Sequence, residues 1–144
     1  MKIILDTNFI IYCTKKKIDY VEELNDLIIE NFEIVISEQV LEELKKITEK
    51  KKQNLPLYKR KPKFKKTTGR DKEAALLALK IIDKKLKDKE IEKIKILGKN
   101  VDDALINLAK QDSKNIICTL DREMRKKLGR VILINSKGRL ILTR

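Results

Sequence analysis

The strongest constraint on the fold is a series of short apolar runs that alternate with amphipathic helical segments. Each run is four residues long and is dominated by aliphatic side chains, which predicts a buried strand. The runs lie at residues 2–5, 33–36, 94–97, 116–119 and 131–134. Strands that alternate with helices are typical of an open parallel sheet covered on both faces. We therefore expect a three-layer α/β/α sandwich with a central, mostly parallel sheet.

Between these runs, apolar residues recur at helical spacing. The predicted helices cover residues 8–15, 19–30, 38–49, a long segment from Asp71, residues 102–110 and residues 121–128. Ser37 is expected to cap the third of them, and residues 140–142 are expected to form an edge strand. The sequence has no internal repeat, and its 144 residues suit one domain over 1–144 with an insert at about 50–70.

That insert concentrates the positive charge. The chain has 35 Lys or Arg against 22 Asp or Glu, and residues 50–70 contain ten of the basic residues and no acid. Pro56, Pro62 and Gly69 predict a loop or arm rather than a helix. Clustered cations favour binding to a polyanion because each neutralised phosphate releases counterions, and aromatic side chains within the run can stack on bases. The predicted nucleic-acid-binding residues are Tyr58, Lys59, Arg60, Lys61, Lys63, Phe64, Lys65, Lys66 and Arg70.

The composition of the insert also fits two other interpretations. The first is a solvated loop without a partner. The second is a membrane surface, which is not expected because no amphipathic apolar face accompanies the charge.

Composition excludes several kinds of chemistry. The chain has no histidine, which removes Ser-His-Asp and Cys-His catalysis and His-ligated zinc. Cys13 and Cys118 are the two cysteines; they are far apart in sequence and favour reduced thiols in a cytoplasmic protein. The four glycines match no dinucleotide-binding or P-loop spacing.

Carboxylates remain as candidates for chemistry. Asp6 follows the first predicted strand, Glu43 lies in the helix after the second, and Asp103 and Asp121 flank the fourth. Because the carboxyl ends of parallel strands line one crevice, we expect these four acids to converge. Each also has an ordinary explanation, since Asp6 and Asp121 could cap helices and Asp103 could complement a helix dipole. Glu43 is the hardest to explain in this way, because its neighbours place it at the boundary of the core, where a lone acid is costly.

A cluster of carboxylates takes up protons unless a cation is bound. Ligation by oxygen alone suits a hard ion such as Mg²⁺ or Mn²⁺. Such an ion activates a bound water and stabilises charge on a phosphate under attack. The acids and the basic insert together therefore indicate a nuclease.

Four stretches, in order, resemble the signature stretches of PIN-domain nucleases. They are ILDTN at 4–8, VLEELKKI at 40–47, VDDALINLA at 101–109 and ICTLDREMRKKL at 117–128. The segments GRDKEAALLALKII, DREMRKKL and LILT are similar to the archaeal, ribosomal-RNA-processing branch, the relatives of the small-subunit processome nuclease. This resemblance implies a divalent-metal-dependent endoribonuclease that cuts single-stranded RNA, with ribosomal RNA as its partner.

The resemblance also implies roles for individual residues. Asp6, Glu43, Asp103 and Asp121 would hold the metal and activate water, while Asn8 and Thr119 would orient that centre. Asp102 and Glu42 are the neighbours that could replace Asp103 and Glu43, and Glu123 is a further candidate ligand through water. The residues followed by Ala-Leu-Ile and by Leu match the family better, so Asp103 and Glu43 are preferred.

Three other functions remain open. The long basic insert favours a processing enzyme over a VapC-type toxin ribonuclease, although both branches share the same acids. A catalytically inactive, RNA-binding PIN module is the second alternative. A phospho-accepting receiver domain is the third, but receivers place a pair of acids after the first strand, where this chain has Asp6 alone. A homodimer is also left open.

Overall fold

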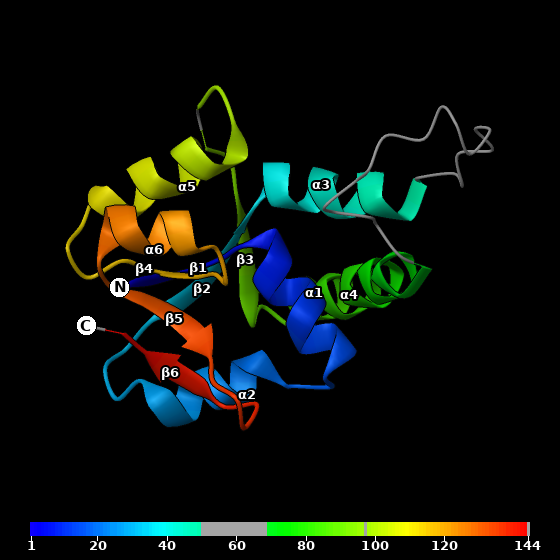
Figure 1. Cartoon of the computed structure of the whole chain (residues 1–144), viewed down its shortest axis with the longest axis horizontal. Coiled ribbons are helices and arrows are strands. Elements are labelled where there is room, and N and C mark those ends of the chain that lie inside the picture. Colours follow the sequence, from blue (N-terminus) through cyan, green and yellow to red (C-terminus); the bar gives the residue numbers. More distant parts are fainter. Residues whose placement is uncertain (50–68, 97, 144) are drawn as a thin grey trace, which may run out of the picture.

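The computed structural model describes residues 1–49, 69–96 and 98–143 (Figure 1). The strands are β1 (Lys2–Leu5), β2 (Glu33–Ser37), β3 (Ile91–Ile94), β4 (Ile116–Cys118), β5 (Val131–Ile134) and β6 (Leu140–Leu142). The helices are α1 (Thr7–Lys15), α2 (Tyr20–Leu27), α3 (Glu38–Glu49), α4 (Gly69–Lys87), α5 (Val101–Lys110) and α6 (Arg122–Leu128). Most of the predicted basic arm, residues 50–68, lies outside the described residues.

The strands form one six-stranded sheet in the order β3-β2-β1-β4-β5-β6. The first five are parallel, and β6 pairs antiparallel with β5 at one edge. Figure 1 shows α5 and α6 together on one side of the sheet and α1, α3 and α4 together on the other. This confirms the predicted three-layer α/β/α sandwich with a mostly parallel sheet.

Strand β1 is the centre of the core. Ile3, Ile4 and Leu5 are fully buried, as expected for a strand with helices on both faces. In the register of the sheet, Ile3 lies opposite Ile34 of β2 and Ile116 of β4. Residues from three distant parts of the sequence therefore pack against one another in the middle of the molecule.

Two predicted elements are wrong in their bounds. The third strand was expected at 94–97 but lies at Ile91–Ile94, where Ile91 is buried against β2 and the two charged residues that follow it are exposed. An edge strand of this kind lacks a continuous apolar run. The apolar pattern of the sequence therefore favours residues 94–97 over the true strand. The helix expected over 19–30 ends at Leu27, because Ile28 has an extended backbone.

The strand order brings particular residues to one crevice. Crossovers between parallel strands are right-handed, so the helices change face where the chain passes from the β1–β2–β3 half to β4. The carboxyl ends of β1 and β4 lie side by side at this switch point, where open α/β sheets bind ligands. No helix in the described ranges is long and apolar enough to span a membrane.

Candidate functional site

Asp6 lies directly after β1, at the switch point of the sheet. It is the N-cap of α1, and its Oδ1 accepts a hydrogen bond from the backbone N–H of Thr7 at 2.8 Å. Its other oxygen, Oδ2, accepts from the Thr119 hydroxyl at 2.7 Å. The Asp6 side chain is only 4% exposed. It is therefore both a helix cap and a buried carboxylate, and the capping role alone does not explain its burial.

Thr7 connects Asp6 to the neighbouring helix α3. Its hydroxyl donates a hydrogen bond of 2.5 Å to Oε2 of Glu43, which is half-buried. Glu42, one position earlier, is exposed. The structure therefore places Glu43, and not Glu42, beside Asp6. The sequence did not single out Thr7, although its place between Asp6 and Asn8 in the motif was a signal.

The electrostatics of this crevice act on Asp6. The pKa of Asp6 is raised from 3.8 to about 6, mainly by burial, and the negative charges of Asp102 and Glu43 act in the same direction. The hydrogen bonds from Thr119 and Thr7 oppose the rise because they stabilise the charged form. Asp6, Glu43 and Asp102 therefore interact electrostatically.

The two acids at the start of α5 are placed differently. Asn100 is the N-cap of α5; its Oδ1 accepts from the backbone N–H of Asp103 at 2.8 Å, and its Nδ2 donates to Asp103 Oδ2 at 2.9 Å. Asp103 is thus engaged with the cap, whereas the charge of Asp102 acts on Asp6. Both side chains are exposed, so the preference for Asp103 stays a prediction, with Asp102 as its alternative. An Asn followed three residues later by an acid is a variant of the capping box, and that signal could have identified the engaged acid.

Thr119 and Asn8 organise the turn that follows β4. Thr119 is buried, and its Oγ1 accepts from the backbone N–H of Asp121 at 3.1 Å while donating to Asp6. Asn8 Oδ1 accepts from the backbone N–H of Leu120 at 3.2 Å. Both side chains hold the β4–α6 turn against the start of α1.

Asp121 is the N-cap of α6, and its Oδ1 accepts from the backbone N–H of Glu123 at 2.8 Å. It is half-buried and joined to Asp6 through Thr119. Glu123 itself is exposed and pairs with Lys126 on the same helix at 3.6 Å. Asp121 therefore borders the crevice, while Glu123 is turned to solvent.

The predicted nucleic-acid-binding residues are mostly outside the described part of the chain. Arg70 is the exception, and it is exposed at the start of α4. Tyr58, Lys59, Arg60, Lys61, Lys63, Phe64, Lys65 and Lys66 all belong to 50–68.

Within residues 1–49, 69–96 and 98–143, no three acidic or cysteine side chains lie close enough to hold a metal ion together. The chemistry of the donors nevertheless fits a hard cation, because Asp6, Glu43 and Asp102 offer only carboxylate oxygens. The thiols are unsuited to metal binding, since burial raises the pKa of Cys13 to about 12 and that of Cys118 well above its usual range.

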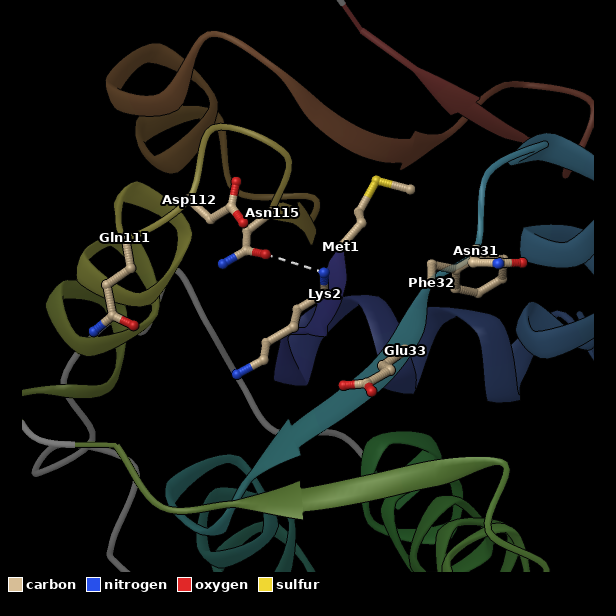
Figure 2. Close-up of a pocket in the computed structure, with 8 residues that line it drawn as sticks. All are labelled: Met1, Lys2, Asn31, Phe32, Glu33, Gln111, Asp112 and Asn115. Atoms are coloured by element: carbon tan, nitrogen blue, oxygen red, sulfur yellow. Dashed lines mark hydrogen bonds between the residues drawn. The ribbon is translucent and has the colours of Figure 1, made fainter.

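A pocket lies at the opposite edge of the sheet (Figure 2). It has a volume of about 460 Å³ and surrounds the amino ends of β1 and β2. Its lining residues are Met1, Lys2, Asn31, Phe32, Glu33, Gln111, Asp112 and Asn115. The dashed bond in Figure 2, from the Lys2 backbone N–H to Asn115 Oδ1, closes this edge of the sheet. None of the predicted site residues lines this pocket.

The fold and the crevice define an α/β protein with one buried carboxylate, Asp6, at the switch point of a parallel sheet. Residues 3–128 match the family model described as "PIN domain". The chain therefore belongs to the PIN-domain family, which confirms the resemblance and sets aside the receiver-domain alternative.

Two individual proteins are similar to this chain, one in sequence and one in fold. The chain is 32% identical over 127 residues to Ribonuclease VapC4 of Methanocaldococcus jannaschii, and the match covers 88% of this chain and 82% of that protein. Its fold is similar to the solved structure described as "Structure of the PIN domain endonuclease Utp24". That match has a TM-score of 0.67 and 20% identity, and it covers 98% of this chain and 90% of the other.

Proposed function

We propose that this protein is a divalent-metal-dependent endoribonuclease that cleaves single-stranded RNA, and that ribosomal RNA is its substrate. The observation that carries the proposal is the buried Asp6 carboxylate, which Thr119 and Thr7 orient in a PIN-family chain. The similarity to Ribonuclease VapC4 along most of the chain supports RNA as the substrate class. The ribosomal assignment rests on the resemblance of the α4, α6 and β6 segments to the processing branch.

Asp6, Glu43, Asp121 and one of the two acids at the start of α5, Asp103 or Asp102, are the residues that would hold Mg²⁺ or Mn²⁺. When bound, the ion supplies a water of lowered pKa and neutralises charge on the phosphate. The chain itself orients the carboxylates: Thr7 holds Glu43, and Thr119 holds Asp6. Such positioning matters because small displacements of a catalytic group reduce the rate strongly.

Cleavage of a labelled single-stranded RNA by the full-length chain tests the proposal. We expect cleavage with Mg²⁺ or Mn²⁺, none with EDTA, and little cleavage of a DNA of the same sequence. Glu43→Gln should reduce the rate by roughly 10²-fold or more, since it weakens stabilisation worth several kcal/mol. Glu42→Gln is the matched control on the same helix and should retain activity. Equal activity of the two variants, or cleavage in EDTA, would contradict the proposed centre.

A VapC-type toxin ribonuclease is the second candidate, and the similarity to Ribonuclease VapC4 is the observation that favours it. Controlled expression in cells distinguishes the two functions. Growth arrest by the wild type but not by Asp6→Asn would support a toxin, whereas cleavage of precursor ribosomal RNA without growth arrest would support processing.

If the protein is an RNA-binding module without activity, it should bind the labelled RNA but cleave it with neither Mg²⁺ nor Mn²⁺. We also propose a cytoplasmic location, because both cysteines are free and buried, as in proteins of reducing compartments. A homodimer is part of the proposal and is checked by light scattering.

A further inference from the structure

Helix α6 has an unusually dense positive charge. It contains four basic residues and one acid in seven positions, whereas α4 has six basic residues and three acids in nineteen. With Arg130, two residues after the helix end, the basic positions form a surface that we call the α6 basic face. It consists of Arg122, Arg125, Lys126, Lys127 and Arg130, all of them exposed.

The charges of this face are largely uncompensated. Lys126 pairs with Glu123 at 3.6 Å, and both side chains are about three-quarters exposed, at 76% and 74%. The other four cations have no carboxylate within ion-pair distance among the described residues. A surface of this kind attracts a polyanion because binding releases condensed counterions.

The face is rigidly joined to the carboxylate crevice. Met124 anchors α6 in the core, and Asp121 caps the helix on the residue directly before Arg122. The Asp121 N–H binds the Thr119 hydroxyl, which binds Asp6. In Figure 1, α6 lies beside α5 and next to β4. Because Asp121 directly precedes Arg122, helix α6 begins at the crevice.

We propose that the α6 basic face binds the backbone of the single-stranded RNA substrate beside the cleavage crevice. At ~1.5 Å per residue the seven-residue helix is about 10 Å long, similar to the axial length of three phosphates in a stacked strand at ~3.4 Å each. The face has no exposed apolar side chain, which favours RNA over a membrane surface. The inference rests on the proposed function, because it takes RNA as the substrate class.

Binding of a fluorescent single-stranded RNA to the full-length chain tests this inference. Anisotropy is measured in EDTA at several salt concentrations, so that cleavage does not contribute. The variant Arg122→Gln/Arg125→Gln/Lys127→Gln removes three cations. We expect the dependence of log Kd on log salt to fall by about 2, since each phosphate contact on a single strand contributes ~0.7. Near 0.1 M salt this corresponds to a Kd increased by roughly 30- to 100-fold.

The matched control is Lys80→Gln/Lys84→Gln/Lys87→Gln, which removes three exposed cations from α4. It should change Kd by no more than about twofold, whereas equal losses in both variants would reflect net charge alone and overturn the inference. The charge-preserving variant Arg122→Lys/Arg125→Lys/Lys127→Arg should keep most of the salt dependence.

A thermal melt verifies that each variant is folded. If the triple variant is unstable, Arg125→Gln alone should lower the salt dependence by about 0.7. Unchanged RNA affinity in a folded α6 variant overturns the inference and assigns the face to another partner, such as an acidic protein. Cleavage by the wild type is assayed separately, in the presence of metal. If the wild type cleaves RNA and the α6 variant still binds RNA normally, only the role of α6 is refuted. A wild type that does not cleave, together with an α6 variant that has lost binding, refutes only the nuclease.

Discussion

The hydroxyl of Thr119 donates a 2.7 Å hydrogen bond to the carboxylate of Asp6, although 113 positions separate the two residues in sequence. The bond joins the ends of β1 and β4, which are neighbours in the sheet. It also opposes the effect of burial on Asp6, because it stabilises the ionised form. Thr119 therefore controls both the orientation and the ionisation of this carboxylate.

Replacing Thr119 by Val tests that control, because Val has nearly the same shape and no hydroxyl. Loss of the hydrogen bond raises the pKa of Asp6 above about 6, so that protons compete more effectively with the cation. We expect the acid limb of the pH–rate profile to move to higher pH by up to about one unit, the value of one hydrogen bond. Thr119→Ser should restore the wild-type profile, and an unchanged limb in Thr119→Val would contradict the role.

Asp6 also makes the folded protein less stable when it is ionised. Its folded pKa of about 6 exceeds its ordinary value of 3.8, so stability falls as the pH rises from the lower value through the upper one. A shift of this size corresponds to roughly 3 kcal/mol. Urea unfolding in EDTA should therefore show that the stability of Asp6→Asn relative to wild type increases between about pH 4 and pH 8. If the stability of Asp6→Asn relative to wild type is the same at pH 4 and pH 8, the pKa of Asp6 is not raised in the folded protein.

Asp102 and Asp103 form a natural pair for comparison on one helix. Asp102→Asn should lower kcat/KM for RNA by about 10- to 100-fold, because it removes a carboxylate that acts on Asp6. Asp103→Asn should stay within a few-fold of wild type and lose a few tenths of a kcal/mol of stability at the α5 cap. The Mn²⁺-induced rise in Tm gives a second measurement, expected to shrink only in Asp102→Asn. The reverse order of effects would restore Asp103 as the functional acid.

Thr7 is expected to act through Glu43. In Thr7→Val the hydroxyl that donates to Glu43 is lost while the Thr7 backbone bond to Asp6 remains possible. We expect kcat to fall by about tenfold with KM nearly unchanged, since misplacement of a catalytic group lowers kcat rather than RNA binding. Rescue by Thr7→Ser separates this positioning role from packing. A fall in stability that explains the whole loss, or no rescue by Ser, would count against it.

The central strands could be predicted because burial on both faces demands continuous aliphatic side chains. The run from Ile3 to Leu5 and the run from Ile116 to Cys118 both satisfy this demand. Strand β3 could not be located in the same way, because Glu92 and Lys93 are exposed at the sheet edge. Register and strand order decide which side chains meet, and no local pattern contains that information.

The site was predictable only to the level of the segments that form it. Asp6 and Glu43 could be picked out because one follows a strand and the other lies at the boundary of the core, and in the structure Thr7 lies between them as the neighbour of Asp6 and the hydrogen-bond partner of Glu43. The choice between Asp102 and Asp103 depended on where α5 begins. Asn100 is the N-cap of α5 and its side chain binds Asp103. The negative charge that raises the pKa of Asp6 comes instead from Asp102, which matches the motif less well.

Pairing of β1 with β4 has a consequence for synthesis of the protein. Ile3 lies opposite Ile116, so the N-terminal strand gains this neighbour only after the 112 residues between them have been made. Until then the first carboxylate lacks its threonine partner, and the last acid of the crevice does not yet exist. The crevice therefore cannot assemble from the N-terminal strand and helix alone and has to wait for residues 116–121.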